Sequence, residues 1–284
     1  MLSEYLLSQQ LDAAVPAQPR LDPAPKRRVR TLFLSDFHLG TVGCKSAALL
    51  EFLNTTQAET TYLVGDVFDN WRPLGGHWTD EHEQIVKLLI ARARGGSRIV
   101  YLPGNHDDFF LRYAGRYFDN LEIMPETWHV TASGERLLVT HGQECDVFAR
   151  RLPALSKAGS WIEAGVRRVD WAVKAGARGV GAPEWNGIGR GLARVNGMIR
   201  ARDRFEERLT DMARQRGADG IVCGHFHKPA LHRDHGVVYA NCGDWVESCS
   251  ALTERMDGTL ELLHWAEEAF ADTVDEPMLD VKVA

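Results

Sequence analysis

The feature that most constrains this chain of 284 residues is a series of polar motifs, each of which directly follows a short apolar segment. The apolar segments have β propensity and are predicted to be strands. Strand ends at one edge of a sheet converge, so we expect the side chains of the motifs to gather at one site. The motifs are Asp36-x-His38, Gly65-Asp66-x-x-Asp69, Gly104-Asn105-His106-Asp107, Thr140-His141-Gly142 and Gly224-His225-x-His227.

The groups expected at this site are carboxylates, imidazoles and one amide. Oxygen and imidazole nitrogen ligands together suit Mn, Fe or Zn better than metals that seek Cys. The sequence therefore predicts a metal site at the strand ends.

The order of predicted elements favours two packed sheets with helices outside over a single parallel sheet. Strands alternate with helices in the first half of the chain, and strands follow one another near the end. Predicted strands cover residues 29–35, 60–64, 98–102, 128–132, 136–139, 220–223, 236–240, 250–255 and 260–265. Predicted helices cover residues 47–53, 81–94 and 108–118. This mixture is typical of the α+β class.

An inserted segment interrupts the predicted catalytic domain, which comprises residues 29–146 and 217–265. The insertion, residues 147–216, has helical character and carries fifteen Lys and Arg against seven Asp and Glu, a net charge of +8 in a chain whose total is −6. We predict a basic helical cap or lid. Residues 1–28, rich in Ala, Pro and Gln, and the acidic residues 266–284 are predicted to be flexible tails.

Composition excludes several other classes. The net charge of −6 argues against a dedicated nucleic-acid binder. The five cysteines contain no CxxC pair, which argues against a disulfide framework or a zinc ribbon. No secretory signal is evident at the start, and no apolar run approaches about 18 residues. The expected location is cytoplasmic, with contact at a membrane surface left open.

The motifs resemble the signature of the metallophosphoesterase (calcineurin-like phosphoesterase) superfamily over about residues 31–245. The resemblance implies a four-layer sandwich of two mixed β-sheets flanked by helices, the metallo-dependent phosphatase fold. It also implies that His106 stabilises the transition state or protonates the leaving oxygen, oriented by Asp69. The implied metal ligands are Asp36, His38 and His227 for one metal, Asn105, His141 and His225 for the other, and Asp66 as the bridge. Two cations about 3.5–4 Å apart can stabilise both the attacking and the leaving side of a phosphoryl transfer, and a metal-bound water can supply hydroxide near neutral pH. The resemblance therefore implies a two-metal hydrolase whose nucleophile is a hydroxide between the metals, with no need for a Ser or Cys nucleophile.

A narrower resemblance involves residues 65–71, the insertion and residues 241–249. Together they are similar to the UDP-2,3-diacylglucosamine pyrophosphatase family of lipid A biosynthesis, which releases UMP and 2,3-diacylglucosamine 1-phosphate. The resemblance implies two divalent ions, Mn²⁺ in the first place with Fe or Zn as alternatives. It also implies a nucleotide-linked acyl-sugar substrate and peripheral contact with the cytoplasmic face of the inner membrane. Members of that family commonly carry Arg where His106 stands here, which places this chain nearer the general phosphoesterase pattern.

Several alternatives stay open. The apolar residues of the insertion can pack as core instead of covering acyl chains. The substrate can be another phosphodiester or nucleotide-linked molecule, and a non-catalytic scaffold is the third hypothesis, disfavoured because every ligand position is kept. The roles of Asp244 and Trp245 and the oligomeric state are not predicted. Candidate substrate contacts are Asn105, His106, Asp146, Arg194, Asn196 and Arg200.

Overall fold

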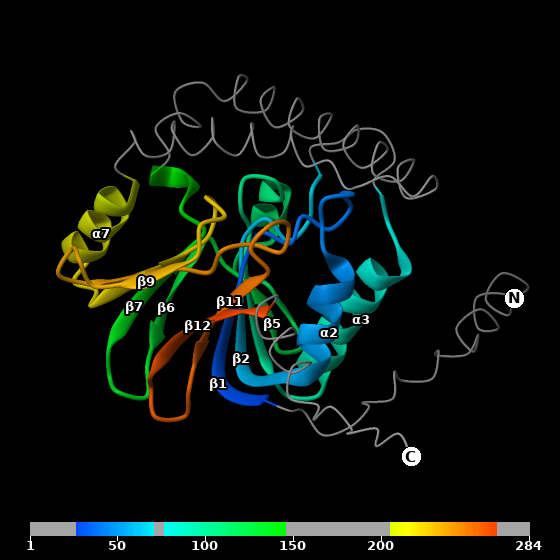
Figure 1. Cartoon of the computed structure of the whole chain (residues 1–284), viewed down its shortest axis with the longest axis horizontal. Helices are drawn as coiled ribbons and strands as arrows, with labels where there is room; N and C mark the ends of the chain where they lie inside the picture. Colours follow the sequence, from blue (N-terminus) through cyan, green and yellow to red (C-terminus); the bar gives the residue numbers. More distant parts are fainter. Residues whose placement is uncertain (1–26, 71–76, 146–204, 266–284) are drawn as a thin grey trace, which may run out of the picture.

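The described part of the chain forms four layers. The computed structural model describes residues 27–70, 77–145 and 205–265. Two mixed β-sheets pack face to face, with two helices outside one sheet and a third helix outside the other (Figure 1). The predicted α+β sandwich is therefore confirmed. Most of the predicted insertion, as well as most of both tails, lies outside the described residues.

The first sheet has seven strands in the order β12-β11-β1-β2-β3-β5-β4. Strands β1, β2, β3 and β5 run parallel, whereas β4, β11 and β12 are antiparallel to their neighbours. Three of the predicted motifs follow the carboxyl ends of β1, β2 and β3. The bounds are β1 Arg27–Leu34, β2 Thr56–Val64, β3 Arg98–Leu102, β4 Tyr117–Phe118, β5 Leu121–Ile123, β11 Ser250–Glu254 and β12 Leu260–His264.

The second sheet has five strands in the order β6-β7-β8-β10-β9. Its three central strands are parallel and its two edge strands antiparallel. The remaining two motifs follow the carboxyl ends of β7 and β8. The bounds are β6 Glu126–Val130, β7 Arg136–Thr140, β8 Gly220–Cys223, β9 Ala230–His232 and β10 Val238–Asn241.

The helices form the outer layers, α2 (Ser46–Thr55) and α3 (Asp80–Arg94) on the first sheet and α7 (Phe205–Gln215) on the second (Figure 1). Helix α3 begins where the His82 side chain accepts a hydrogen bond from the Thr79 backbone N–H at 3.1 Å, and it ends at Gly95. None of the described helices is long and apolar enough to cross a bilayer.

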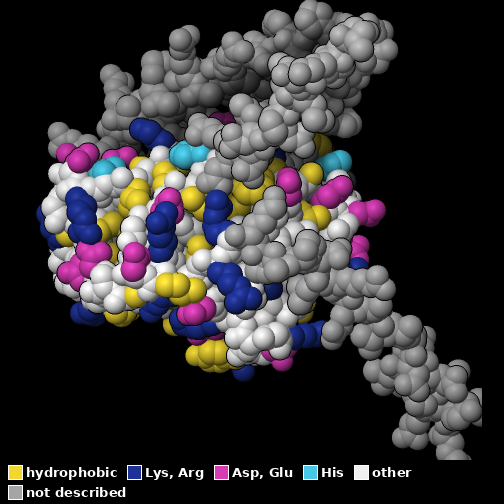
Figure 2. Space-filling view, turned by 60° about the horizontal axis from the view of Figure 1, so that its bottom comes forward, with side chains coloured by type: hydrophobic (Ala, Val, Ile, Leu, Met, Phe, Trp, Pro, Cys, Tyr) yellow, Lys and Arg dark blue, Asp and Glu magenta, His cyan; other side chains and the backbone are white. Residues whose placement is uncertain are grey.

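Apolar side chains fill all three spaces between the layers. Phe33, Val64 and Leu102 of the first sheet meet Val139 and Val222 of the second. A second cluster joins the first sheet to α2 and α3, and a third joins the second sheet to α7. On the face drawn in Figure 2, basic and acidic side chains are interspersed among apolar ones. The site described below is thus supported by a packed frame on both sides.

The structure corrects the helix predicted over residues 108–118. A short 3₁₀ helix, η1, covers Asp108–Tyr113, and strand β4 follows at Tyr117–Phe118. Gly115 has a φ of +77° and donates its N–H to the Ile123 carbonyl, so the chain turns back to pair with β5. The short strands β5 and β9 were not predicted, and β1 begins two residues earlier than expected.

Candidate metal centre

The five motifs meet at one edge of the two packed sheets, where β1, β2, β3, β7 and β8 end (Figure 1). Two groups of side chains there could each hold a cation, with ligand atoms within 4.8 Å of one another. The first sheet supplies both carboxylates, and the second supplies three of the imidazoles. The groups are Asp36, His38 and His227, and Asp66, His141 and His225. His38, Asp69 and His106 form a third, overlapping group.

The backbone of these residues is unusual. Asp36, His38, Asp66, His225 and His227 all have a φ between 50° and 70°, in the left-handed region that non-glycine residues rarely adopt. Each such residue costs on the order of 1–3 kcal/mol and persists only where surrounding contacts fix it. Here Asp36 donates its N–H to the Gly65 carbonyl at 3.0 Å, and His38 donates to the Asp66 carbonyl at 2.9 Å. The two motif loops therefore hold one another in this conformation.

Two glycines of the motifs allow this close approach. A Cβ on Gly104 would lie 2.3 Å from Asp66 Oδ1, and one on Gly224 would lie 2.6 Å from Asp36 Oδ2. Neither carboxylate could keep its place beside a larger residue. This contact explains the glycines that precede the Asn105 and His225 positions.

Asp66 lies between the two groups. Its Oδ2 is 3.4 Å from His141 Nε2 and 3.9 Å from His38 Nε2. In the first group, Asp36 Oδ1 is 3.0 Å from His227 Nε2, which in turn is 3.3 Å from His38 Nε2. One carboxylate thus faces ligands of both groups.

The donor atoms fit divalent cations. Among the described residues, Asn105 Oδ1 is buried and has no hydrogen-bond partner, which costs about 1–3 kcal/mol when no ligand is bound. The buried Asp36 Oδ1 and His141 Nε2 each lie against another proposed ligand, His227 Nε2 at 3.0 Å and Asp66 Oδ2 at 3.4 Å. The opposite ring nitrogen, His141 Nδ1, lies 2.8 Å from the Val64 carbonyl oxygen, which directs Nε2 into the centre. Oxygen and imidazole nitrogen in this number suit a hard or borderline cation.

The charges at the centre also favour cations. Burial alone would raise the pKa of the Asp36 carboxyl, but His227 and His141 outweigh it and lower that pKa. Burial likewise opposes ionisation of Asp66, yet His141 and His106 hold its pKa well below the usual value. Burial and the neighbouring His106 lower the pKa of His38 to about 4. Both carboxylates therefore stay ionised, and His38 stays neutral and able to bind a metal.

His106 and Asp69 lie together at the edge of the centre. His106 Nδ1 is 3.3 Å from Asp69 Oδ1, and its ring stands edge-on to the His38 ring at a centroid distance of 4.7 Å. The His106 backbone N–H donates to Asp66 Oδ1 at 2.8 Å. Burial would lower the pKa of His106, but Asp66 and Asp69 raise it overall, which favours the protonated ring.

Asp107 is a residue to which the sequence analysis gave no role. It is fully buried and accepts hydrogen bonds from the backbone N–H groups of Gly104 at 2.6 Å, Val67 at 2.7 Å and Phe68 at 3.1 Å. The Tyr101 hydroxyl donates to it as well, at 2.5 Å. Asp107 thus joins the loops after β2 and β3, and its place as the last residue of its motif was the available signal.

The segment 241–249, whose role was left open, supports the loop after β1. The buried Asp244 accepts hydrogen bonds from the Val246 N–H at 2.6 Å and the Ser248 hydroxyl at 2.9 Å. Trp245 donates its backbone N–H to the Asp36 carbonyl at 3.1 Å, while its fully buried ring packs near Phe52. The segment therefore positions Asp36 through the backbone rather than through the metal.

Only two of the six predicted substrate contacts lie within the described residues. Asn105 and His106 lie in the centre. Asp146, Arg194, Asn196 and Arg200 lie outside the described residues.

Comparison with known proteins gives consistent matches. The family model for calcineurin-like phosphoesterases matches residues 29–229. A UDP-2,3-diacylglucosamine hydrolase from Ralstonia nicotianae is 26% identical over 230 residues, which cover 75% of this chain and 82% of the relative. A UDP-2,3-diacylglucosamine hydrolase from Pseudomonas aeruginosa is 27% identical over 215 residues, which cover 71% of this chain and 83% of the relative. Among solved structures, Yfce, a phosphoesterase from E. coli, has a TM-score of 0.39 at 15% identity and covers 82% of this chain and 98% of its own.

Proposed function

This chain belongs to the calcineurin-like phosphoesterase family, and we propose that it hydrolyses the pyrophosphate of UDP-2,3-diacylglucosamine to UMP and 2,3-diacylglucosamine 1-phosphate. The observation that carries the proposal is the pair of ligand groups joined at Asp66, with His106 beside them. Membership of the family makes the chain a metal-dependent phosphoesterase. The substrate rests on the relatives, which are named UDP-2,3-diacylglucosamine hydrolases.

In this proposal seven side chains hold two divalent cations, with Mn²⁺ as the first candidate. Bound there, the cations would supply an acidified water and positive charge for the phosphoryl oxygens. Asp66 would bridge them, because its Oδ2 faces ligands of both groups. The terminal ligands are Asp36, His38 and His227 on one side and Asn105, His141 and His225 on the other.

His106 has the position of a general acid in this reaction. As the phosphorus–oxygen bond to the leaving phosphate breaks, that oxygen gains charge and can take a proton from His106. Asp69 faces Nδ1 at 3.3 Å, so it orients the ring and leaves Nε2 as the nitrogen that donates. The buried, ion-paired setting favours a ring that carries the proton before the reaction.

The basic insertion supports an acylated substrate. A net charge of +8 with interspersed Trp and Val suits a molecule that carries a pyrophosphate and two acyl chains near an anionic membrane. The protein would then act at the cytoplasmic face of the inner membrane.

One observation favours a second candidate, a different phosphodiester or nucleotide-linked substrate: His106 occupies the position where the resembling family commonly carries Arg.

Turnover of matched substrates tests the proposal. The purified protein with Mn²⁺ is incubated with UDP-2,3-diacylglucosamine, with its deacylated form and with a simple phosphodiester, and UMP or product release is measured. We expect release of UMP from the acylated substrate and a large loss of rate on deacylation. Ready hydrolysis of the simple diester without UMP release would refute the substrate and favour the second candidate.

A matched pair of variants tests the metal centre itself. Asp66→Asn removes the charge of the proposed bridge and should reduce bound Mn²⁺ and abolish turnover. Asp119→Asn makes the same chemical change at an exposed residue paired with Arg94, and it should behave as wild type. Full activity in Asp66→Asn would contradict the two-metal assignment.

A further inference from the structure

The end of strand β10 carries a buried amide that has no role in the proposed mechanism. Asn241 is the last residue of β10 and lies beside Cys223, the last residue of β8, in the second sheet. Its side chain is fully buried. The motif loop of residues 224–227 begins directly after β8. Asn241 therefore lies at the point where this loop leaves the sheet.

The Asn241 amide is hydrogen-bonded at both its nitrogen and its oxygen. Its Nδ2 donates to the Gly224 carbonyl at 3.0 Å, and its Oδ1 accepts from the Gly243 backbone N–H at 2.9 Å. The first contact holds the loop 224–227, and the second holds the segment 241–249. An amide suits this place because a carboxylate offers no donor to the Gly224 carbonyl and an aliphatic side chain offers neither a donor nor an acceptor.

Gly224, the first residue of the motif loop, is fixed from two sides. Its backbone N–H donates to the His141 carbonyl at 3.1 Å, while its carbonyl accepts from Asn241. The residues that follow it, His225 and His227, have φ angles of 70° and 53°, in the left-handed region. Such a backbone persists only where surrounding contacts fix it. The hydrogen bond from Asn241 is one of those contacts.

A second set of contacts connects Asn241 with the loop after β1. Gly243, which donates its N–H to Asn241, accepts a hydrogen bond at its carbonyl from the Ser35 hydroxyl at 2.8 Å. Ser35 is fully buried and directly precedes Asp36. Asp36 Oδ2 in turn accepts a hydrogen bond from the His225 backbone N–H at 3.0 Å. Together with the bond to the residue before His225, these contacts form a closed ring that runs through two proposed ligands.

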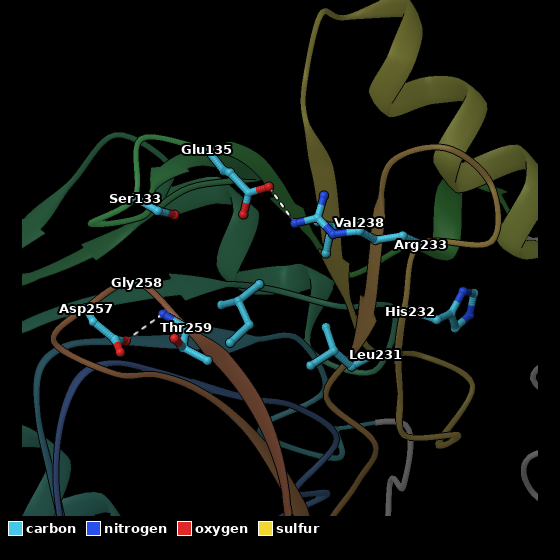
Figure 3. Close-up of a pocket in the computed structure, with 10 residues that line it drawn as sticks. Ser133, Glu135, Leu231, His232, Arg233, Val238, Asp257, Gly258 and Thr259 are labelled. Atoms are coloured by element: carbon cyan, nitrogen blue, oxygen red, sulfur yellow. Dashed lines mark hydrogen bonds and ion pairs between the residues drawn. The ribbon is translucent and has the colours of Figure 1, made fainter.

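The beginning of β10 has a different setting. Val238, the first residue of the strand, lines a hollow of about 450 Å³ together with Leu231 and Leu260 (Figure 3). The described residues that line this hollow include none from the five motifs, and Asn241 is not among them. The hydrogen bonds of Asn241 thus connect it with the loops of the metal centre and not with the hollow.

We propose that Asn241 is a positioning residue for both proposed metal sites. The loop 224–227 supplies His227 to the first ligand group and His225 to the second, so one amide holds the backbone of a ligand in each group. Loss of a single ligand such as His227 should weaken one site, whereas loss of the Asn241 hydrogen bonds should weaken both. This role rests on the two-metal centre proposed above and is independent of the substrate.

Binding of Mn²⁺ by the full-length protein tests this inference. Metal-free wild type and Asn241→Leu are titrated with Mn²⁺, and the free ion is measured by its electron paramagnetic resonance signal. Leucine has a similar size but removes both polar groups and adds no charge. We expect both dissociation constants to rise about 10–100-fold in the variant, the range for groups that orient metal ligands. Unchanged affinity at both sites, or a change confined to one site, would overturn the proposal.

Asn120→Leu is the matched control. The Asn120 Nδ2 also donates to a backbone carbonyl, that of Ala93, at 3.0 Å, and its own carbonyl accepts from Ile99 near the beginning of β3, away from the centre. This variant should bind Mn²⁺ as wild type does. Equal losses of Mn²⁺ affinity in the two variants would contradict a specific role for Asn241. A wild type that bound no Mn²⁺ would refute the proposed centre, and this role with it.

Two additions keep the test decisive if Asn241→Leu folds poorly. The free energy of unfolding, measured with a chelator present, separates a general loss of stability from a loss of metal affinity. In Asn241→Ser the shorter hydroxyl cannot serve both Gly224 and Gly243, so both dissociation constants should rise, by less than in Asn241→Leu. Wild-type Mn²⁺ affinity in a folded Asn241→Ser protein would overturn the proposal.

Discussion

At the scale of single residues, the centre depends on side chains that do not face the reaction. Five of the seven proposed ligands, Asp36, His38, Asp66, His225 and His227, adopt left-handed backbone angles, which persist only where surrounding contacts fix them. Asp107 provides much of this surrounding, because its two oxygens accept hydrogen bonds from both the loop after β2 and the loop after β3. Burial raises the pKa of Asp107 to about 6, so its carboxylate depends on these donors.

Asp107→Asn should therefore damage the centre without removing a ligand. The amide places N–H groups against backbone N–H donors, so we expect a loss of about 1–3 kcal/mol in the free energy of unfolding and at least a tenfold fall in kcat. Urea unfolding and steady-state kinetics measure the two effects. Asp108→Asn, at the exposed neighbouring residue, is the matched control. Wild-type stability in Asp107→Asn would show that its hydrogen bonds do not hold the loops.

His106→Ala separates catalysis from metal binding. In the proposed mechanism His106 donates a proton and holds no metal, so the variant should keep two Mn²⁺ per chain while kcat falls by about 10²–10⁴-fold. Asp69→Asn should lower kcat less, because the ring remains and only its orientation is affected. Metal content and kcat are measured on the same preparations. A metal-free His106→Ala protein would mean that this residue is a ligand.

At the scale of elements, a buried ionic network joins β11 to β1 and β6 on the side of the sheets away from the centre. The fully buried Glu254 receives hydrogen bonds from Thr31 at 2.6 Å, Arg30 at 2.7 Å and the Ala132 N–H at 2.7 Å, and its carboxylate lies 2.8 Å from His129 Nε2. Burial alone would raise the pKa of Glu254, but the hydrogen bonds with His129, Thr31 and Ala132 lower it to about 2. The network therefore connects the two sheets only while Glu254 is ionised.

Glu254→Gln should destabilise the protein in a way that depends on pH. The pKa is lower in the folded protein than its usual value of 4.5, so this stabilisation is complete above about pH 4.5 and is lost as the pH falls toward 2. We expect the variant to lose about 1–3 kcal/mol in the free energy of unfolding at pH 7, and this loss should become smaller below pH 4.5. Chemical unfolding of wild type and variant across this range measures the effect, with Glu261→Gln, at a half-exposed residue paired with Arg255, as control. If the difference in unfolding free energy between wild type and variant did not change with pH, the assigned ionisation of Glu254 would be contradicted.

At the scale of the whole molecule, the proposed metal centre connects the two sheets. Asp36 and Asp66 come from the first sheet, whereas His141, His225 and His227 come from the second. Bound cations would therefore add cross-sheet bonds to the apolar packing between the layers. Ions that bind only the folded chain stabilise it by mass action.

Removal of metal should consequently lower stability as well as activity. Treatment with a chelator should abolish turnover, and Mn²⁺ at about 100 times its dissociation constant should raise the free energy of unfolding by about 2.7 kcal/mol per site. Denaturant unfolding with and without Mn²⁺ measures the shift. The same experiment on Asp66→Asn should give a much smaller shift in the free energy of unfolding. Unfolding that is insensitive to Mn²⁺ in wild type would contradict a cross-sheet centre.

The sequence predicted the architecture and the convergence of motifs because both follow from local patterns. Apolar runs fixed the long strands, as at 98–102 and 220–223, and the motifs at their ends marked the site. Predictions from the sequence failed where contacts between distant parts of the chain determine the local structure. The left-handed turn at Gly115 replaced the end of a predicted helix by β4. The role of Asp107 depends on the backbone N–H of Val67, which lies 40 residues away in the sequence.

The distribution of ligands along the chain also sets when the centre can form during synthesis. His38 and His227, 3.3 Å apart in the folded protein, are separated by 189 residues. At about 5–20 residues per second, translation needs about 10–40 s to pass from one to the other. Throughout that interval the emerging chain lacks one of the three residues of the first proposed metal site, His227. The full set of proposed ligands therefore exists only after β8 and the loop that follows it have been synthesised, and a chain that stops before β8 cannot complete the centre.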